Sequence, residues 1–304
     1  METKQKIRLF AMLGPFLMVA TSGAASYQLV CGQQRTITEA LRRLPPGDTL
    51  FVSGACSESV LIPEQVVNIT LDGQGTATIN GPDASSSTIN VRGNGITIRN
   101  FASITGGETG IIVTRGGTAT IDRNVIQNTG NNGIIVSLSS SARIINNTIQ
   151  GNPANGILIT EGSSARIGFV MTDDTEASPN VIQKNGENGI IVTGTSNARI
   201  VGNTISGNTE NGILVNRVSH GDVSSNTIDS NGGDGVFVLR NSGVNLGEDT
   251  GSGILDSTNT TNVNNAGFGI RCVINSYGDG RIGTLNGASG AVSFAANCVN
   301  ATIP

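Results

Sequence analysis

Three arginines and one aspartate share a single position of a repeated segment, and they are the side chains of this chain best placed to hold a ligand. Arg143, Arg166 and Arg199 are followed by Asp222, at spacings of 23, 33 and 23 residues. Because a guanidinium makes bidentate contacts with carboxylates, the row predicts a strip that binds an acidic polysaccharide. The alternative is a solvated face, since guanidiniums about 5 Å apart repel by only about 0.8 kcal/mol per pair in bulk water.

The chain contains one histidine, His220, which lies two residues before Asp222. Histidine exchanges a proton near neutral pH, so His220, Asp222 and Arg199 are the candidates for acid–base catalysis. His220 has no partner acid in its own repeat other than Asp222. The sequence therefore favours a solvated surface histidine over a catalytic one.

Two insertions interrupt the repeat, near 168–179 and 247–259, and both leave it at the same position three repeats apart. With two uninserted repeats between them they would form the walls of a notch roughly 14 Å wide. Calcium prefers several hard oxygen ligands, so the acidic residues of these insertions predict a calcium-assisted carbohydrate site. The alternative is a pair of solvated acidic loops that need no cofactor. The carboxylates concerned are Asp173, Asp174, Glu176, Glu248 and Asp249.

These positions depend on a repeat of 23 residues, in which each copy begins with glycine and a short apolar run. A fixed period of this size is typical of stacked units that bury their apolar faces on one another. The clearest copies begin at Gly110, Gly133, Gly156, Gly189, Gly212 and Gly235, with a weaker one at Gly269.

Each copy contains three short β-branched runs and no helical periodicity, which predicts one turn of a parallel β-helix. Alternation places Ile157, Ile159, Ala165 and Ile167 in the core. Earlier and later runs bring the expected total to about eleven coils.

Asparagines at the corners support this arrangement, because asparagine tolerates the left-handed conformation and stacked amides can hydrogen-bond along a column. Three rows are expected. They are Asn124, Asn147, Asn180, Asn203 and Asn226; Asn152, Asn185, Asn208 and Asn231; and Asn132, Asn155, Asn188, Asn211 and Asp234.

A row of apolar residues lies between the two inward positions of the leading strand, so alternation points it outward. An outward apolar stripe is unusual on a free monomer. Either an insertion or the tail covers it, or it is a surface for self-association. Its members are Ile112, Ile135, Leu158, Ile191, Leu214 and Phe237.

The unit N-x-I-x-x-N-x-x-N-G-I-x-V resembles the right-handed parallel β-helix repeat of the pectin-lyase-like superfamily. Segments 36–50 and 71–75 resemble its capping region. The resemblance implies an all-β, single-stranded, right-handed parallel β-helix, a solenoid with an N-terminal capping helix. It does not imply one activity, because the superfamily includes lyases, hydrolases, esterases, epimerases, phage tailspikes and non-catalytic surface proteins. The paired Asp-Asp and Gly-His-Gly motifs of polygalacturonases are absent from the sequence.

Residues 1–25 have the pattern of a secretory signal peptide, with basic residues, a short apolar run and small residues at the end. Cleavage is expected after Ala24 or after Ala25. Residues 26–49 are expected to form an N-terminal cap with a helix over 36–44, where Thr36 and Glu39 form a capping box. Residues 50–304 are expected to form the β-helix.

Four cysteines lie in two pairs near the ends of the chain. Because export leads to an oxidising compartment, disulfides are expected, and the near pairs Cys31–Cys56 and Cys272–Cys298 are favoured over pairings that span the solenoid.

Loss of the signal would change the net charge from −4 to about −6, which argues against a nucleic-acid partner, and no later stretch is apolar enough for a stable membrane span. The sequence therefore favours a protein that is secreted to the extracellular space, the periplasm or the cell surface. There it would bind extracellular or cell-wall polysaccharide or a cell-surface glycan without catalysis and without a required cofactor. The alternative is a lyase, hydrolase or epimerase acting on uronate-containing glycans.

Overall fold

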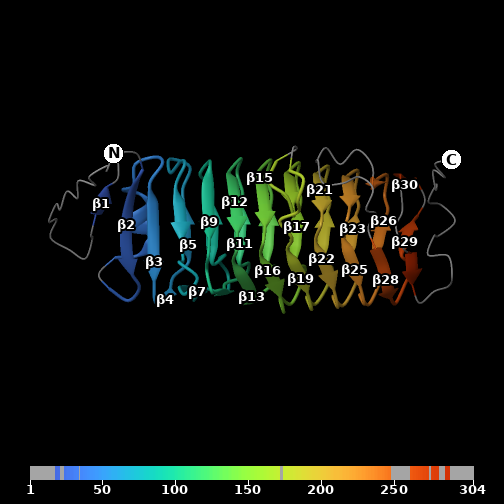
Figure 1. Ribbon diagram of the computed structural model, residues 1–304, viewed down its shortest axis with the longest axis horizontal. Coiled ribbons are helices and arrows are strands. Elements are labelled where there is room, and N and C mark those ends of the chain that lie inside the picture. The colour runs from blue at the N-terminus through green and yellow to red at the C-terminus, as the bar shows by residue number, and fades with distance from the viewer. Residues whose placement is uncertain are drawn as a thin grey trace, which may run out of the picture.

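The computed structural model describes residues 18–20, 24–33, 35–171, 174–247, 261–273, 275–280 and 285–287. The chain winds into a column of stacked turns, and the colours follow the chain order along the long axis (Figure 1). Corresponding strands of successive turns pair to form three long sheets, here named A, B and C. The fold is therefore an all-β parallel solenoid with almost no helix.

Sheet A has twelve strands. They are β1 (Met18–Ala20), β2 (Ala25–Val30), β3 (Thr49–Ser53), β6 (Thr70–Asp72), β9 (Ile96–Arg99), β12 (Thr118–Asp122), β15 (Ser141–Ile145), β18 (Ser164–Ile167), β21 (Asn197–Val201), β24 (His220–Ser224), β27 (Gly243–Leu246) and β30 (Tyr277–Gly280). Sheet B has ten strands. They are β4 (Ala55–Ser57), β7 (Thr78–Gly81), β10 (Ser103–Gly106), β13 (Val125–Thr129), β16 (Thr148–Gln150), β19 (Val181–Gln183), β22 (Thr204–Ser206), β25 (Thr227–Asp229), β28 (Thr261–Asn265) and β31 (Leu285–Gly287). Sheet C has nine strands. They are β5 (Val60–Ile62), β8 (Ile89–Val91), β11 (Ile111–Val113), β14 (Ile134–Val136), β17 (Ile157–Ile159), β20 (Ile190–Val192), β23 (Ile213–Val215), β26 (Val236–Val238) and β29 (Ile270–Cys272).

The number of complete turns is about nine, which corrects the expected eleven. Among the described residues sheet C has nine strands, sheet B ten and sheet A twelve, with β1 antiparallel to β2. The outermost turns thus contribute to only some of the sheets. The last apolar run that entered the expected count, at Val292 and Phe294, lies outside the described residues.

The core is a column of aliphatic side chains supplied by alternate residues of the strands. Ile157, Ile159 and Ile167 are fully buried and Ala165 is 6% exposed, as the alternation predicted. The same pattern recurs along the column, and these residues belong to one continuous cluster. Burying apolar surface on both neighbouring turns is the main contribution to the stability of such a column.

The leading glycine of each repeat is required by close approach of the next turn. A Cβ on Gly133 would lie 2.6 Å from Ile149 Cγ2 and 2.7 Å from the Gly156 carbonyl oxygen. Gly156, Gly189 and Gly212 meet equivalent atoms. These distances are too short for any side chain, so the glycine that begins each repeat is a packing requirement.

The three predicted asparagine rows are confirmed as buried amide ladders. In the first row Asn147 Nδ2 donates to Asn180 Oδ1 at 3.0 Å, and Asn180 Nδ2 donates to Asn203 Oδ1 at 2.8 Å. Two backbone N–H groups of that row, those of Asn147 and Asn180, donate to the same oxygens. The second row continues beyond its predicted end to Asn265. These bonds satisfy corner amides that would otherwise be buried without partners.

A serine row was not predicted. The backbone N–H groups of Ser140, Ser163, Ser196 and Ser219 each donate to the hydroxyl of the serine one turn further on, which ends the row at Ser242. The row lies at the corner between sheets C and A. Serine is common in surface loops, so the sequence alone did not distinguish these serines from ordinary loop residues. Their register on successive turns of the structure does.

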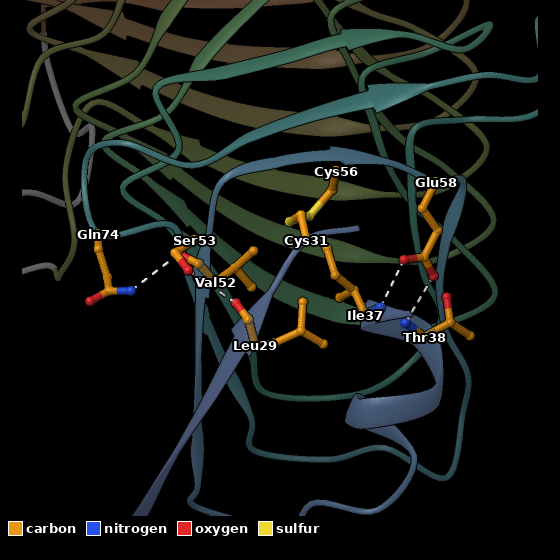
Figure 2. Close-up of a disulfide and its surroundings, with 9 residues drawn as sticks. All are labelled: Leu29, Cys31, Ile37, Thr38, Val52, Ser53, Cys56, Glu58 and Gln74. Carbon is orange, nitrogen blue, oxygen red and sulfur yellow. Dashed lines mark hydrogen bonds between the residues drawn. A yellow bond between two sulfur atoms is a disulfide. The ribbon is translucent and has the colours of Figure 1, made fainter. Parts of the chain in front are cut away.

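The N-terminal cap contains helix α1 (Ile37–Leu41), shorter than the expected 36–44. The predicted capping box is confirmed, with Thr36 as the N-cap and Glu39 as its partner. Glu58 adds two bonds from outside the helix, because its carboxylate accepts the N–H groups of Ile37 and Thr38 at 2.7 and 2.9 Å (Figure 2). Carboxylates near a helix N-terminus are favourable, so Glu58 anchors the cap to the first turn.

The predicted disulfide between Cys31 and Cys56 is confirmed, with a Cα–Cα distance of 4.9 Å (Figure 2). It joins the segment that follows β2 to β4. The predicted Cys272–Cys298 bridge lies outside the described residues, because Cys298 does. The predicted signal segment also lies largely outside them.

Candidate functional site

An open groove of about 810 Å³ follows the outer face of sheet A. It spans six turns, from β9 to β24, which is about 24 Å at the usual strand spacing. Two outward rows line it. The first is Thr118, Ser141, Ser164, Asn197 and His220, and the second is Thr97, Thr120, Arg143, Arg166, Arg199 and Asp222.

The predicted row of four charged residues is confirmed in register. Arg143 pairs with Arg166, Arg166 with Arg199, and Arg199 with Asp222, on β15, β18, β21 and β24. The backbone position of each arginine is therefore one strand spacing from the next, at the same point across the groove. This gives a linear cationic strip on a chain whose net charge is negative.

The middle arginine is the most constrained of the three. Burial, followed by the charges of Arg143 and Arg199, lowers the pKa of Arg166, while Asp174 acts in the opposite sense. Its Nη1 donates to the carbonyl of Val170 at 3.1 Å, and its guanidinium lies 5.9 Å from the centre of the Phe169 ring. The first insertion therefore holds Arg166 in place.

The C-terminal end of the groove brings the three catalytic candidates together. His220 Nε2 lies 3.0 Å from Asp222 Oδ1, and Arg199 Nε lies 3.6 Å from Asp222 Oδ2. The Asp222 carboxylate thus stands between the imidazole and a guanidinium. This arrangement can orient the histidine and compensate charge at the same point.

Two neighbours of this cluster were missed by the sequence reasoning. Asn245 Nδ2 donates to Asp222 Oδ1 at 3.1 Å, and the ring of Tyr277 lies 6.5 Å from that of His220. Tyr277 reaches this position because Gly243 lies between them, where a Cβ would be 2.2 Å from Tyr277 Cζ. Asn245 follows Asp222 by 23 residues, so the repeat spacing could have identified it. Tyr277 follows Gly243 by 34 residues, because the second insertion lies between them.

The row of hydroxyl and amide side chains beside the arginines was also missed. Ser164 Oγ donates to Ser141 Oγ at 3.3 Å, and both are exposed in the groove. Such side chains both donate and accept hydrogen bonds, as the hydroxyl groups of a sugar do. The groove thus combines cationic and neutral polar positions over its whole length.

The two insertions leave the same edge of sheet A, after β18 and after β27, as predicted. The first does not stand away from the column. Phe169 is fully buried against Val201, with Ala177 packed on the pair, so the loop lies over the corner of the next turn and occupies part of the expected notch.

The predicted calcium ligands are only partly described. Asp174 Oδ2 accepts the backbone N–H groups of Val170 and Met171 at 2.7 and 2.8 Å, so this oxygen fits a loop cap better than a metal ligand. Glu176 is exposed, and Asp173, Glu248 and Asp249 lie outside the described residues. No cluster of three or more metal-binding side chains occurs among the residues with described positions.

The apolar row lies where alternation predicted, on the outer face of sheet C. Ile112, Ile135 and Leu158 pair in register, followed by Ile191, Leu214 and Phe237, and all six are half-buried. The row ends at Arg271, whose guanidinium lies 4.0 Å from the centre of the Phe237 ring. The described part of the first insertion packs on Val201 of sheet A and so does not cover this row. No helix in the described ranges is long and apolar enough to span a membrane.

A family model described as "Right handed beta helix region" matches residues 62–175 and 109–276, which together span most of the chain. No curated protein sequence matches. Among solved structures, the pectate lyase Pel9A is similar with a TM-score of 0.64 and 14% identity, covering 90% of this chain and 79% of that one. The A-module of the mannuronan C-5 epimerase AlgE6 from Azotobacter vinelandii has a TM-score of 0.52 and 13% identity, covering 92% and 89%. The ORF18 protein of Geobacillus virus E2 has a TM-score of 0.60 and 12% identity, covering 87% and 56%. Identities this low establish the fold alone.

Proposed function

Because the chain belongs to the right-handed parallel β-helix family of the pectin-lyase-like superfamily, we propose that it is a secreted module that binds uronate-containing polysaccharide along sheet A without cleaving it. One observation carries this proposal: three arginines stand in register on consecutive turns inside a continuous groove. An extended polysaccharide laid along the groove would present its carboxylates to this strip.

The chemistry of the groove supports an acidic ligand. Arginine pairs with carboxylates through two parallel hydrogen bonds, and the adjacent hydroxyl row can bond sugar hydroxyls. The names of two similar structures also point to such polymers, since pectate and mannuronan are chains of uronate units. A long open groove suits a polymer better than a small molecule, which prefers an enclosed pocket.

The proposal is tested by measuring binding of the purified protein to pectate, alginate and neutral dextran at two salt concentrations. We expect binding to the two polyuronates, weaker binding at higher salt because ion pairs are screened, and none to dextran. Arg166→Gln should weaken polyuronate binding about tenfold, whereas Arg43→Gln, an exposed arginine of the cap, should leave it unchanged. Equal binding of Arg166→Gln and wild type would refute the proposed role of the strip.

A second candidate is catalysis on the same polymers, which the contacts among Arg199, His220 and Asp222 favour. In this reading His220 removes the proton from the carbon next to a uronate carboxylate, and Arg199 compensates the carboxylate charge. A proton supplied by water to the opposite face then gives epimerisation, with the proton on His220 lost to solvent. Alternatively, the neighbouring carbon–oxygen bond breaks and the leaving oxygen takes up the proton held by His220, giving elimination.

Product analysis separates the two candidates. Incubation with pectate or mannuronan, followed by absorbance of unsaturated ends, reducing-end assay and proton NMR of the uronate units, should give no change if the protein only binds. Product formation that disappears in His220→Ala would establish catalysis and displace the binding proposal.

We also propose that residues 1–25 act as a signal peptide and that the protein works in an extracellular or periplasmic compartment. The Cys31–Cys56 disulfide supports this location, because such bonds persist in oxidising environments. Expression with the complete N-terminus and fractionation of the host cells tests it, with recovery outside the cytoplasm as the expected result.

A further inference from the structure

The beginning of β2 lies against a buried carboxylate. The backbone N–H of Ala25 donates to Asp48 Oδ1 at 2.7 Å. Ser26 pairs with Thr49 of β3, so Ala25 and Asp48 are neighbours one residue before the paired strands. Asp48 is only 5% exposed.

This carboxylate has no cationic partner among the described residues. Asp48 Oδ2 is buried, and the carboxylate forms no ion pair with any side chain in the described ranges. Burial, followed by the charge of Asp48 and a side-chain hydrogen bond to it, raises the pKa of the nearby Tyr27 hydroxyl. A carboxylate is costly to bury without a cation, so this site calls for a positive group beside Ala25.

We propose that the chain is cleaved between Ala24 and Ala25, and that the α-ammonium released at Ala25 forms an ion pair with Asp48. The inference rests on the signal peptide proposed above. Hydrolysis of this bond adds one water, leaves a carboxylate on Ala24 and leaves an amine on Ala25 that takes up a proton at neutral pH. The nitrogen that now donates one hydrogen to Asp48 would then carry three, enough to reach both carboxylate oxygens.

Cleavage after Ala25 would not place the new α-ammonium beside Asp48. Ala24 is exposed and Ala25 is buried at 9% exposure, so cutting after Ala24 keeps the packed Ala25 side chain, although it also removes β1 from the edge of sheet A. Cutting one residue later would remove the Ala25 contact and place the new ammonium beyond Asp48, whose carboxylate would stay buried and unpaired. Small residues at positions −1 and −3, Ala24 and Ser22, fit a signal-peptidase site.

N-terminal sequencing and intact mass of the exported protein test the cleavage position. The expected first residue is Ala25. A chain that begins at Ser26 overturns the assignment while leaving the signal peptide intact, and an uncleaved chain overturns both.

The ion pair has its own test, a pH titration of the α-amino group by NMR in the processed protein. In wild type the α-amino pKa should lie above its ordinary value of about 8, and in Asp48→Asn it should return to that value, whereas the exposed Asp83→Asn should behave as wild type. A raised folded pKa means that the added stability is present below the ordinary value and is lost as pH rises through the folded one. An unshifted α-amino group in wild type overturns the ion pair.

Discussion

Asn147 and Asn180 are 33 residues apart in the chain, yet the amide of one donates to the amide of the other at 3.0 Å. The first insertion lies between them, and it leaves their pairing unchanged. The ladder therefore belongs to the turns of the column and not to the local spacing of the sequence.

Asn180→Ala should lower the free energy of unfolding by roughly 3 kcal/mol. Four buried hydrogen bonds of the Asn180 side-chain amide would be lost, and the backbone N–H of Asn147 would be left without a partner, because its acceptor is Asn180 Oδ1. Urea unfolding measures this. Gln183→Ala is the control on the same turn, since its amide donates to Gln150 at a half-exposed position and should contribute less than about 1 kcal/mol. Equal losses in both variants would contradict the role given to the buried ladder.

Val218→Asn should raise stability by about 1 kcal/mol. Val218 is 60% exposed and has a φ of +62°, a left-handed conformation that is strained for a β-branched residue. The next turn has Asn241 at the same position, with a φ of +59°. Thermal unfolding should show the gain, and Val30→Asn, an exposed valine outside the left-handed region, should show none.

Asp234→Asn should change the pH dependence of stability. Burial raises the pKa of Asp234, and the contact of its Oδ2 with Arg271 Nε at 2.7 Å only partly offsets this. The folded state of wild type therefore holds this proton to higher pH than the unfolded state. Its stability should fall as pH rises from about 4, the unfolded value, through the raised folded pKa, and be flat above it.

Unfolding of wild type and Asp234→Asn between pH 3.5 and 8 measures this effect. The stability of the variant relative to wild type should rise across that window. Glu176→Gln, an exposed carboxylate, is the control and should run parallel to wild type. A constant difference between Asp234→Asn and wild type would contradict the raised pKa.

Leu158→Lys tests the apolar row of sheet C as a surface for self-association, which we propose for it. Leu158 is central in the row, and its outward position means that the substitution leaves the core intact. Sedimentation should show association of wild type and its loss in the variant. A wild-type protein that stays monomeric at high concentration would contradict self-association through this row.

Calcium binding stays a prediction for the insertions. Calorimetry should show uptake that Asp173→Ala/Asp174→Ala abolishes, together with a loss of glycan binding. Because Asp174 Oδ2 already accepts two backbone N–H groups, the same double substitution should also loosen the loop around Val170. If calorimetry of the wild-type protein showed no heat of calcium binding, the predicted calcium site would be refuted.

The structural features that recur from turn to turn could be predicted from the sequence. The amide ladders, the arginine row and the alternation around Ile157 follow from period and register, because stacked turns place equal positions in line. The burial of Phe169 on Val201 could not be predicted, since an insertion folds by contacts that occur once. The position of the Tyr277 ring could not be predicted for a related reason, because it depends on the second insertion and on the space left by Gly243. Helix α1 ends at Leu41, short of the expected Leu44, although the apolar stripe continues.

The glycine at the head of each repeat has a consequence for how this protein can evolve. Since each turn fits the next through identical contacts, as Gly133 does with Gly156, a tandem duplication of one 23-residue unit would extend the column without redesigning either neighbour. The groove would lengthen by one strand spacing, about 4.8 Å, and would gain one more arginine if the copied unit is the one that begins at Gly133 and carries Arg143. Ligand length could thus be adjusted by gene duplication, in whole turns, while the cross-section stays constant.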